Sequence, residues 1–423
     1  MQTYKDLDKE QLEKRKEELL KIYEDYKNKN LKLDMSRGKP CTEQVDLSNG
    51  LFENTDNLFT RDGFDCRNYG LLDGIQEAKE LFAELFDLSA EQVFVGGNSS
   101  LNLMYDLIAK AYIFGLNGFE KPWGKQENIK FLCPAPGYDR HFAITEQFGI
   151  EMITIPMKND GPDMDMVEDL VSRDESIKGM WCIPMYSNPT GLTYSDTVVR
   201  RLASMKTKAK DFRIIWDNAY AFHHLYDEHD KLLNILDEAE KAGNPDRVYM
   251  FSSTSKITFP GGGISIMASS RENIAHIKKQ ISIQTIGYNK INMLLHVRFL
   301  KNPENIKNLM RKHADIIRPK FDAVNEILSK NLNGKGIARW NNPRGGYFIS
   351  LNVLNGCAKR TVALAKEAGV TLTPAGATYP YGNDPDDSNI RIAPTYPPVS
   401  ELRTAMEILS VCIELAAIEK ILG

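Results

Sequence analysis

Short apolar runs alternate with helical patterns through the middle of the chain. Six such runs lie at residues 92–95, 129–133, 152–157, 179–184, 212–216 and 248–251. Strands that alternate with helices predict βαβ units and a mostly parallel sheet. Residues 264–268 follow the last run too closely for a helical crossover, so we expect an antiparallel strand there.

The first part of the chain has a different pattern. Residues 8–26 carry Leu12, Leu19, Leu20 and Tyr23 among dense charge. Apolar residues at this spacing predict a solvated helix with one apolar stripe.

The last third of the chain changes pattern again. Residues 271–332 are highly charged and predict helices. Beyond them short strands alternate with helices, up to a final helix that Glu414 and Glu419 make amphipathic. This pattern predicts a second, smaller α+β domain.

A chain of 423 residues exceeds the size at which a single core usually stops growing. We therefore expect two domains. Residues 1–45 form an N-terminal arm that belongs partly to the small domain, residues 46–300 the large domain, and residues 301–423 the small C-terminal domain.

Composition excludes several classes of protein. With 42% hydrophobic and 26% charged residues and a net charge of −4, the chain has the balance of a soluble globular protein. Basic and acidic residues are interspersed, so we expect no nucleic-acid surface. The N-terminal segment lacks the pattern of a secretory signal, and no apolar run reaches membrane-spanning length. We expect a cytoplasmic protein.

Cysteine and histidine spacing argues against a metal site. The six cysteines show no C-x-x-C spacing, which fits a reducing compartment and no disulfide framework. The seven histidines are dispersed, and only His223 and His224 adjoin. Adjacent side chains rarely point at one metal, so we interpret this pair as structural.

Four short segments carry side chains typical of one chemistry. They are residues 187–191, 216–220, 253–256 and 389–391. Together they supply an amide, a carboxylate, a phenol, an amine and a guanidinium. Each signal is weak alone, but Asn188, Asp217 and Lys256 follow one another at intervals of 29 and 39 residues. A cofactor that forms an imine and keeps its ring nitrogen protonated needs this set, so the sequence predicts a pyridoxal 5'-phosphate site.

Each of these residues also has a structural interpretation. A desolvated Lys256 amine can form a Schiff base, although a lysine at a strand end is usually a surface residue. Asp217 ends a strand where α/β sheets hold ligands, and a pyridinium would keep it charged. It could instead cap a helix. Tyr220 and Asn188 would donate to the ring oxygen, and residues 187–191 could also be a plain turn.

Small residues indicate where a phosphate binds. The predicted phosphate ligands are Ser253, Ser255, Asn98, Ser99 and Ser100. Three of them open a helix, where free N–H groups favour an anion, although Asn98 or Ser99 could simply cap that helix. Glycines 261–263 would let the backbone approach a ligand closely or form a bulge.

Two further residues complete the candidate site. Arg391 lies among apolar neighbours in a predicted strand, where an arginine needs an anion. A substrate α-carboxylate would bind it in bidentate geometry, and an ion pair within the protein is the alternative. Tyr138 follows Pro136 and Gly137 and would stack on the pyridine ring or anchor a turn in the core.

These residues as a set resemble the fold-type-I pyridoxal-phosphate enzymes, and among them the class I aminotransferases. The motifs that carry the resemblance are SRGKP, RNYGLLDG, GGNSSLN, PAPGYDRHF, YSNPTG, WDNAY, STSKITFPGGG and NIRIAPTYPP. They are similar to those of the divergent type Ic subgroup of aspartate aminotransferases, over nearly the whole chain. The resemblance implies an α/β fold, with a large domain around a mostly parallel, seven-stranded type of sheet and a smaller α+β domain.

The resemblance also implies roles for the residues. Lys256 would carry the cofactor as a Schiff base, with Asp217 paired to the pyridinium. Asn188 and Tyr220 would bond the ring oxygen, and Arg391 would bind the α-carboxylate. Lys256, Asp217 and Tyr220 would be the catalytic residues.

Other implied roles depend on position. Tyr69 matches the tyrosine that reaches the cofactor phosphate of the neighbouring subunit, which implies a homodimer with shared sites. Arg37 and Gly38 are assigned to substrate binding, with Arg37 the candidate that selects an acidic side chain. The family usually has a phosphate-binding arginine eight residues after the lysine, and here that position is Ile264.

The implied activity is transfer of an amino group between L-aspartate, or a similar acidic amino acid, and 2-oxoglutarate by a ping-pong mechanism. A related pyridoxal enzyme, an aspartate 4-decarboxylase or a β-lyase, is the first alternative. The second is a regulator that binds the cofactor without catalysis, but such a regulator needs a DNA-binding domain, and the 35 residues before Ser36 predict only one helix.

Overall fold

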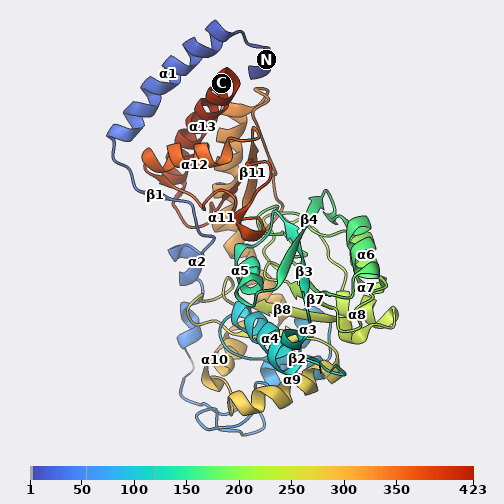
Figure 1. Ribbon diagram of the computed structural model, residues 1–423. Helices are drawn as coiled ribbons and strands as arrows, with labels where there is room; N and C mark the ends of the chain where they lie inside the picture. Colours follow the sequence, from blue (N-terminus) through green and yellow to red (C-terminus); the bar gives the residue numbers. More distant parts are fainter. Residues whose placement is uncertain (1–2, 54, 120) are drawn as a thin grey trace.

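The computed structural model describes residues 3–53, 55–119 and 121–423. A large domain built on a central sheet occupies the lower part of Figure 1, and a small domain with both chain termini occupies the upper part. The fold class is therefore the predicted one. Within the described ranges, no helix combines the length and the apolar character needed to cross a membrane.

The central sheet has eight strands in the order β2-β9-β8-β7-β6-β3-β4-β5. Their bounds are β2 (Val93–Val95), β3 (Lys130–Ala135), β4 (Glu151–Lys158), β5 (Gly161–Pro162), β6 (Ile177–Cys182), β7 (Arg213–Asp217), β8 (Val248–Ser253) and β9 (Ser265–Ala268). Strands β8, β7, β6, β3 and β4 pair in parallel, and β9 is antiparallel to both of its neighbours. These findings confirm the predicted strands. The two-residue edge strand β5 was not predicted.

Helices cover both faces of this sheet. They are α3 (Gln76–Phe86), α4 (Ser100–Phe114), α5 (Asp139–Gln147), α6 (Met164–Arg173), α7 (Asp196–Ser204), α8 (Ile235–Lys241), α9 (Arg271–Gln284) and α10 (Lys290–Leu300). The short helix α2 (Thr42–Asp46) packs beside α11 instead. Side chains of β7 alternate between the two layers: Ile214 and Trp216 pack with α3, α6, α7 and α8, and Ile215 packs with α4, α5 and α9. Burial on both faces explains why the strands are continuous apolar runs.

The small domain has an antiparallel sheet of β10 (Ala338–Trp340), β11 (Ile349–Val353) and β13 (Asn389–Ile392). Its helices are α1 (Lys9–Asn28), α11 (Pro303–Leu332), α12 (Ala358–Glu367) and α13 (Val399–Leu422). Strand β1 (Leu33–Asp34) pairs in parallel with β12 (Val370–Thr371) and ties the N-terminal segment to this domain. Short 3-10 helices occur at Tyr4–Asp6, Asn49–Phe52, Ala90–Gln92, Trp123–Lys125, Pro245–Arg247 and Pro380–Gly382.

Helix α11 belongs to two cores. Its first half, with Ile306 and Met310, packs beside Leu300 at the end of α10. Its second half, from Ile317 to Leu332, lies in the core of the small domain. The division into residues 1–45, 46–300 and 301–423 stays our proposal, because this helix joins the two domains without an interruption.

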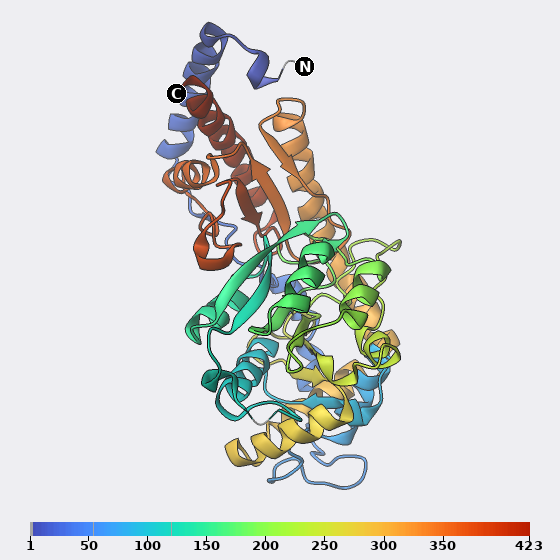
Figure 2. The same ribbon diagram turned by 45° about the vertical axis from the view of Figure 1, so that its right-hand side comes forward.

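The N-terminal helix packs along α13 near the chain termini (Figure 2). Its stripe of Leu12, Leu19 and Tyr23 is buried as predicted. Leu20 is 39% exposed, so its assignment to the stripe is wrong. Leu20 directly follows Leu19, and one residue turns the side chain about 100° around the helix.

Glu414 in α13 is buried, so the prediction that it faces solvent is wrong. It accepts hydrogen bonds from the hydroxyl of Tyr4 and from Arg15 Nη2, the latter at 3.1 Å, and pairs with Lys335 Nζ at 2.7 Å. Burial and the adjacent Glu414 carboxylate raise the pKa of Tyr4. The interior position is stable because two cations and a phenol compensate the charge.

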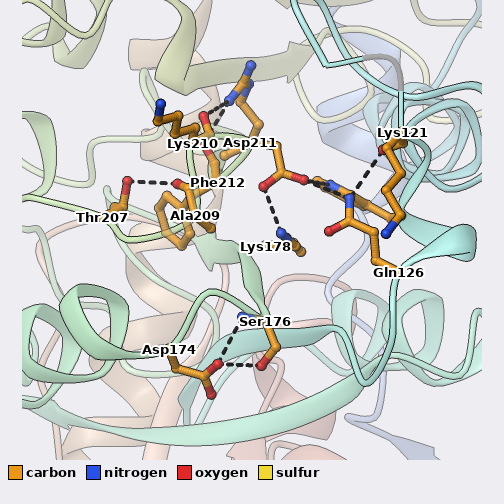
Figure 3. A network of polar contacts seen from close by, with 12 residues as sticks. Lys121, Gln126, Asp174, Ser176, Lys178, Thr207, Ala209, Lys210, Asp211 and Phe212 are labelled. Carbon is orange, nitrogen blue, oxygen red and sulfur yellow. Dashed lines mark hydrogen bonds and ion pairs between the residues drawn. The ribbon is translucent and has the colours of Figure 1, made fainter.

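A polar network closes the amino edge of the central sheet. Figure 3 shows Lys178 of β6 and Gln126 converging on Asp211, which precedes β7. Asp211 accepts hydrogen bonds from Lys178 Nζ at 2.8 Å, Gln126 Nε2 at 3.0 Å and Trp123 Nε1 at 3.2 Å. The Lys178 and Asp211 side chains are only 5% and 9% exposed.

We predict that Asp211→Asn lowers the free energy of unfolding by about 3–5 kcal/mol, because it leaves Lys178 as an uncompensated buried charge. Urea unfolding measures this change. The matched control is Glu326→Gln, which breaks an exposed 2.6 Å ion pair with Arg403 and should change the free energy of unfolding far less. Equal losses in the two variants would contradict the interpretation of Asp211.

Candidate active site

Lys256 lies in a tight turn just after β8, at the carboxyl edge of the central sheet. Its Nζ is 5.0 Å from the ring centroid of Tyr220 and 6.0 Å from that of Tyr347. Burial lowers the pKa of the Lys256 amine, while the Asp217 charge opposes this shift. The surroundings therefore favour a neutral amine more than water does.

Two buried histidines hold the backbone at this turn. His313 Nε2 donates to the carbonyl of Ile257 at 3.0 Å, and His223 Nε2 lies 3.4 Å from the carbonyl oxygen of Lys256. Burial lowers the pKa of His313 to about 4, so its ring is neutral. Gln44 Nε2 lies 3.0 Å from His313 Nδ1 and from the hydroxyl of Tyr347. These contacts fix the backbone of the turn that carries Lys256. The structural role that we predicted for His223 fits this position.

Asp217 is the last residue of β7, and its two carboxylate oxygens differ. Oδ2 accepts a 3.0 Å hydrogen bond from His141 Nε2, and the His141 ring stacks on Trp181 at a centroid distance of 4.3 Å. Oδ1 is buried and has no hydrogen-bond partner among the described residues. The helix-capping alternative does not apply, since the next helix is α8 and Asn234 caps it.

Two tyrosines surround this carboxylate. Tyr220 is buried, and burial raises the pKa of its phenol well above the usual value, with further contributions from Tyr138 and Asp217. Burial, followed by the Asp217 charge, raises the pKa of Tyr138 to about 12. The rings of Tyr138 and His141 meet edge to face at 5.0 Å. Both phenols are therefore protonated donors near Asp217.

Arg391 of β13 brings the small domain into the site. Its Nη1 donates to Asp139 Oδ1 at 2.9 Å and to Asn188 Oδ1 at 3.3 Å, and Nη2 donates to Thr373 Oγ1 at 3.1 Å. The Phe348 ring lies 5.0 Å from the guanidinium. Both interpretations of Arg391 stay open, because an internal ion pair exists and the buried Nε has no partner among the described residues.

The same aromatic ring links the domains. Phe348 meets the Tyr220 ring edge to face at 6.4 Å. Gly38 packs closely on the same ring, since an added Cβ at this position would lie 2.4 Å from Phe348 Cζ. Any side chain at position 38 would displace this ring. The SRGKP segment therefore borders the site at Gly38.

The predicted phosphate ligands also come together. Ser253 Oγ donates to Ser255 Oγ at 3.1 Å, and Ser255 Oγ donates to the carbonyl of Asn98 at 3.1 Å. Ser99 precedes α4 and makes no side-chain capping bond, so the first N–H groups of that helix are not capped by Ser99. An adjoining cavity of about 480 Å³ is lined by Gly97, Asn98, glycines 261–263 and Asn292, among others.

Position 264 does not supply a phosphate ligand. Ile264 is 1% exposed, lies in the apolar core, and its backbone bonds to Thr254. None of the described residues lining the cavity carries a positive charge.

Two predicted residues are not brought into this cluster. Tyr69 lies on a surface loop and is 78% exposed. The Arg37 side chain is also exposed, although it adjoins Gly38. Arg344, which like Arg37 precedes a glycine, pairs with Glu228 and Asp230 instead. The roles of Tyr69 and Arg37 stay predictions.

Sequence reasoning missed three residues that touch the cluster: His141, Asp139 and Thr373. His141 and Asp139 lie in the PAPGYDRHF motif, at the start of α5. A carboxylate is common in the first turn of a helix, so Asp139 gave no sign of another role. The i,i+3 spacing of Tyr138 and His141 places both on one side of this turn and could have signalled a shared target.

The described residues include no cluster of three or more histidine, cysteine or acidic side chains that could hold a metal. All six cysteines are buried and unpaired. The groups that meet at the carboxyl edge are a desolvated amine, a carboxylate with one unused oxygen, two phenols and a guanidinium. Such a set can bind an aromatic cofactor and a carboxylate substrate side by side.

Comparison with known proteins identifies the family. The family model described as aspartate amino-transferase matches residues 7–423. The aspartate aminotransferase of Corynebacterium glutamicum is 48% identical over 419 residues, which cover 99% of this chain and 97% of the relative. A crystal structure of an aspartate transaminase from C. glutamicum has a TM-score of 0.97 at 47% identity, with 99% of each chain covered.

A more distant structure shares the fold. An alpha-aminoadipate aminotransferase from Thermus thermophilus, solved with N-(5'-phosphopyridoxyl)-L-leucine, has a TM-score of 0.73 at 20% identity, covering 92% of this chain and 93% of that one. The match to the family model over almost the full length and the 48% identity agree with the type Ic resemblance of the motifs. The chain is therefore an aminotransferase, and it belongs to the aspartate aminotransferase family.

Proposed function

We propose that this aminotransferase is a cytoplasmic, pyridoxal-phosphate-dependent enzyme that exchanges the amino group between L-aspartate and 2-oxoglutarate. The observation that carries the cofactor assignment is the unused, buried Oδ1 of Asp217. A buried carboxylate without a partner on one oxygen is costly, and a pyridinium N–H satisfies both its charge and its hydrogen bond.

The other residues fit the same cofactor. Lys256 offers the amine for its aldehyde, and Tyr220 and Asn188 offer donors for its ring oxygen. Ser253, Ser255 and the α4 N-terminus, with Asn98, Ser99 and Ser100, would hold its phosphate. Tyr138 would lie on its ring face. When bound, the cofactor supplies an electron sink for the bonds at the substrate Cα.

The chain itself supplies binding and proton transfer. Arg391 binds the α-carboxylate and so fixes the substrate Cα near Lys256. Burial lowers the pKa of the Lys256 amine, which favours its neutral form, and in that form the amine takes the proton from Cα as a general base. Asp217, held by His141, would place its carboxylate against the ring nitrogen of the cofactor. The packed rings of Tyr220, Tyr347 and Phe348 keep water away from Lys256.

The substrate pair is supported by the relatives. The C. glutamicum protein named aspartate aminotransferase is 48% identical along almost the whole chain. We propose Arg37 as the residue that pairs with the second carboxylate of aspartate, since it adjoins Gly38 at the border of the site. Because each half-reaction uses the same amine and arginine, the kinetics should be ping-pong.

We also propose a homodimer in which Tyr69 completes the partner's site. Tyr69 projects from the surface, and large apolar side chains are exposed at the ends of α4 and α9, among them Phe114 and Ile283. The two helix ends adjoin, since Lys110 Nζ donates to Gln284 Oε1 at 2.6 Å. An exposed apolar patch of this kind is typical of an interface.

A panel of amino donors with 2-oxoglutarate tests the proposed function. We expect aspartate to be among the best donors, with oxaloacetate and glutamate as products and parallel lines in double-reciprocal plots. Lys256→Arg keeps a positive side chain but removes the primary amine, and should lower kcat by about 100-fold or more, the contribution of a general base. Coupled keto-acid assays measure both.

Specific products would contradict this proposal. Release of CO₂ or pyruvate without an amino acceptor would indicate the decarboxylase or the lyase instead. Specific DNA retention at moderate salt would indicate the regulator. Full turnover by Lys256→Arg, or a borohydride-reduced protein without a pyridoxyl group on the peptide containing Lys256, would refute the site.

Arg391→Ala should lower kcat/KM by about 100-fold or more, because two charge-assisted hydrogen bonds to the α-carboxylate are worth roughly 1.5–3 kcal/mol each. Steady-state kinetics measure this loss. Arg403→Ala, which removes an exposed ion pair, is the control and should leave kcat/KM unchanged. A loss below about threefold in Arg391→Ala would show that this arginine has only a structural role.

The acidity of Lys256 gives a separate test. Burial disfavours the ammonium form, so in cofactor-free protein Lys256 should react with cyanate with a midpoint below that of exposed lysines such as Lys9. Asp217→Asn removes the charge that raises this pKa, and should move the midpoint lower still. Peptide mass spectrometry against pH measures both; a midpoint at or above that of Lys9 would contradict the assignment.

A further inference from the structure

Asp139 is a carboxylate that the proposed reaction does not use, yet it contacts the arginine that would bind the substrate. Its Oδ1 accepts a 2.9 Å hydrogen bond from Arg391 Nη1. The Arg391 side chain is 7% exposed and that of Asp139 is 34% exposed. The guanidinium charge is therefore balanced from its solvent side before any substrate binds.

The orientation of the guanidinium does not depend on Asp139. Nη1 also donates to Asn188 Oδ1 at 3.3 Å, and Nη2 donates to Thr373 Oγ1 at 3.1 Å. The ring of Phe348 covers one face, with its centroid 5.0 Å away. These neutral contacts fix the plane of the guanidinium, so the distinct contribution of Asp139 is its charge.

The other edge of Arg391 keeps hydrogen-bonding capacity, because Nη2 gives only one of its two N–H groups to Thr373. Its buried Nε has no partner among the described residues. Nε and Nη2 form the lateral fork that holds a carboxylate in bidentate geometry. A substrate on this fork and Asp139 on Nη1 would flank one cation, and at that separation two carboxylates repel each other.

We infer that Asp139 is a specificity-determining residue whose charge sets the affinity of Arg391 for carboxylates and keeps small anions out of the empty subsite. The inference rests on the proposed role of Arg391. An amino-acid substrate overcomes the repulsion through its other contacts. A small anion such as acetate or chloride has only the arginine to bind, so the same repulsion excludes it.

Asp139→Asn tests the inference, because it keeps an oxygen acceptor for Nη1 and removes the charge. In the holoenzyme we expect the KM for aspartate and the inhibition constant of maleate, a dicarboxylate that cannot react, to fall about fivefold or more. Inhibition by acetate and chloride should strengthen by a similar factor, and kcat should change less than KM. Asp139→Ala should shift KM in the same direction.

The matched control is Asp196→Asn. Asp196 is the first residue of α7, as Asp139 is of α5, and it pairs with Arg200 at 3.7 Å on an exposed surface. This variant loses the same helix-terminal charge and should leave the KM and inhibition constants unchanged. An Asp139→Asn variant whose KM rises, or stays within twofold of the parent, would overturn the inference.

Arg391→Ala separates the two ways in which the experiment can fail. If its kcat/KM falls by less than threefold, the proposed role of Arg391 is wrong, and the inference loses its basis. If its kcat/KM falls by 100-fold while Asp139→Asn changes neither KM nor anion inhibition, the proposed function stands and only the inference about Asp139 is refuted.

Discussion

The rest of the site depends on one carboxylate, that of Asp217, which is buried inside the protein. Asp217 terminates the central strand β7, where both faces of the sheet are covered and water has little access. Removing a carboxylate from water is costly unless it is paired and hydrogen-bonded. His141 satisfies one oxygen, and Trp181 fixes His141 by stacking. The second oxygen, Oδ1, has no such partner among the described residues. A cationic N–H donor placed next to Oδ1 would therefore be strongly favoured.

The site requires both domains, because its two charged ends come from different sheets. Asp217 belongs to the large sheet, and Arg391 belongs to β13 of the small one. Phe348 connects them, because its ring meets that of Tyr220 edge to face and also lies 5.0 Å from the guanidinium of Arg391. The distance between the two ends therefore depends on how the domains pack. Helix α11 contributes buried residues to both cores and so helps to fix that packing.

Much of the fold could be predicted because the strands of the central sheet are buried on both faces. Such strands appear in the sequence as continuous apolar runs. The strand ends at which Lys256 and Asp217 lie could be predicted from the apolar runs before them, and their roles in the site stay proposals. The burial of Glu414 could not be predicted, since its cations come from Arg15 and Lys335, which are far away in the sequence. His141 and Asp139 were missed for a related reason: each acts on a residue of another element. When a residue acts by contacting a residue of a distant element, the hydrophobic pattern of its own segment does not reveal that role.

The carboxylate of Asp217 and the guanidinium of Arg391 each have one opposite charge in the proposed site. Neither of them is therefore left to bind the cofactor phosphate. Asp217 would be matched by a protonated ring nitrogen, and Arg391 is already matched by Asp139. The phosphate region offers hydroxyls and helix N–H groups, and the described residues that line its cavity carry no positive charge. Neutral donors oriented by a helix can hold an anion, but more weakly than donors combined with a guanidinium. In the proposed dimer, a chain with Ile264 in place of that arginine would depend more on groups outside this cluster, such as the proposed contribution of Tyr69, to retain the cofactor.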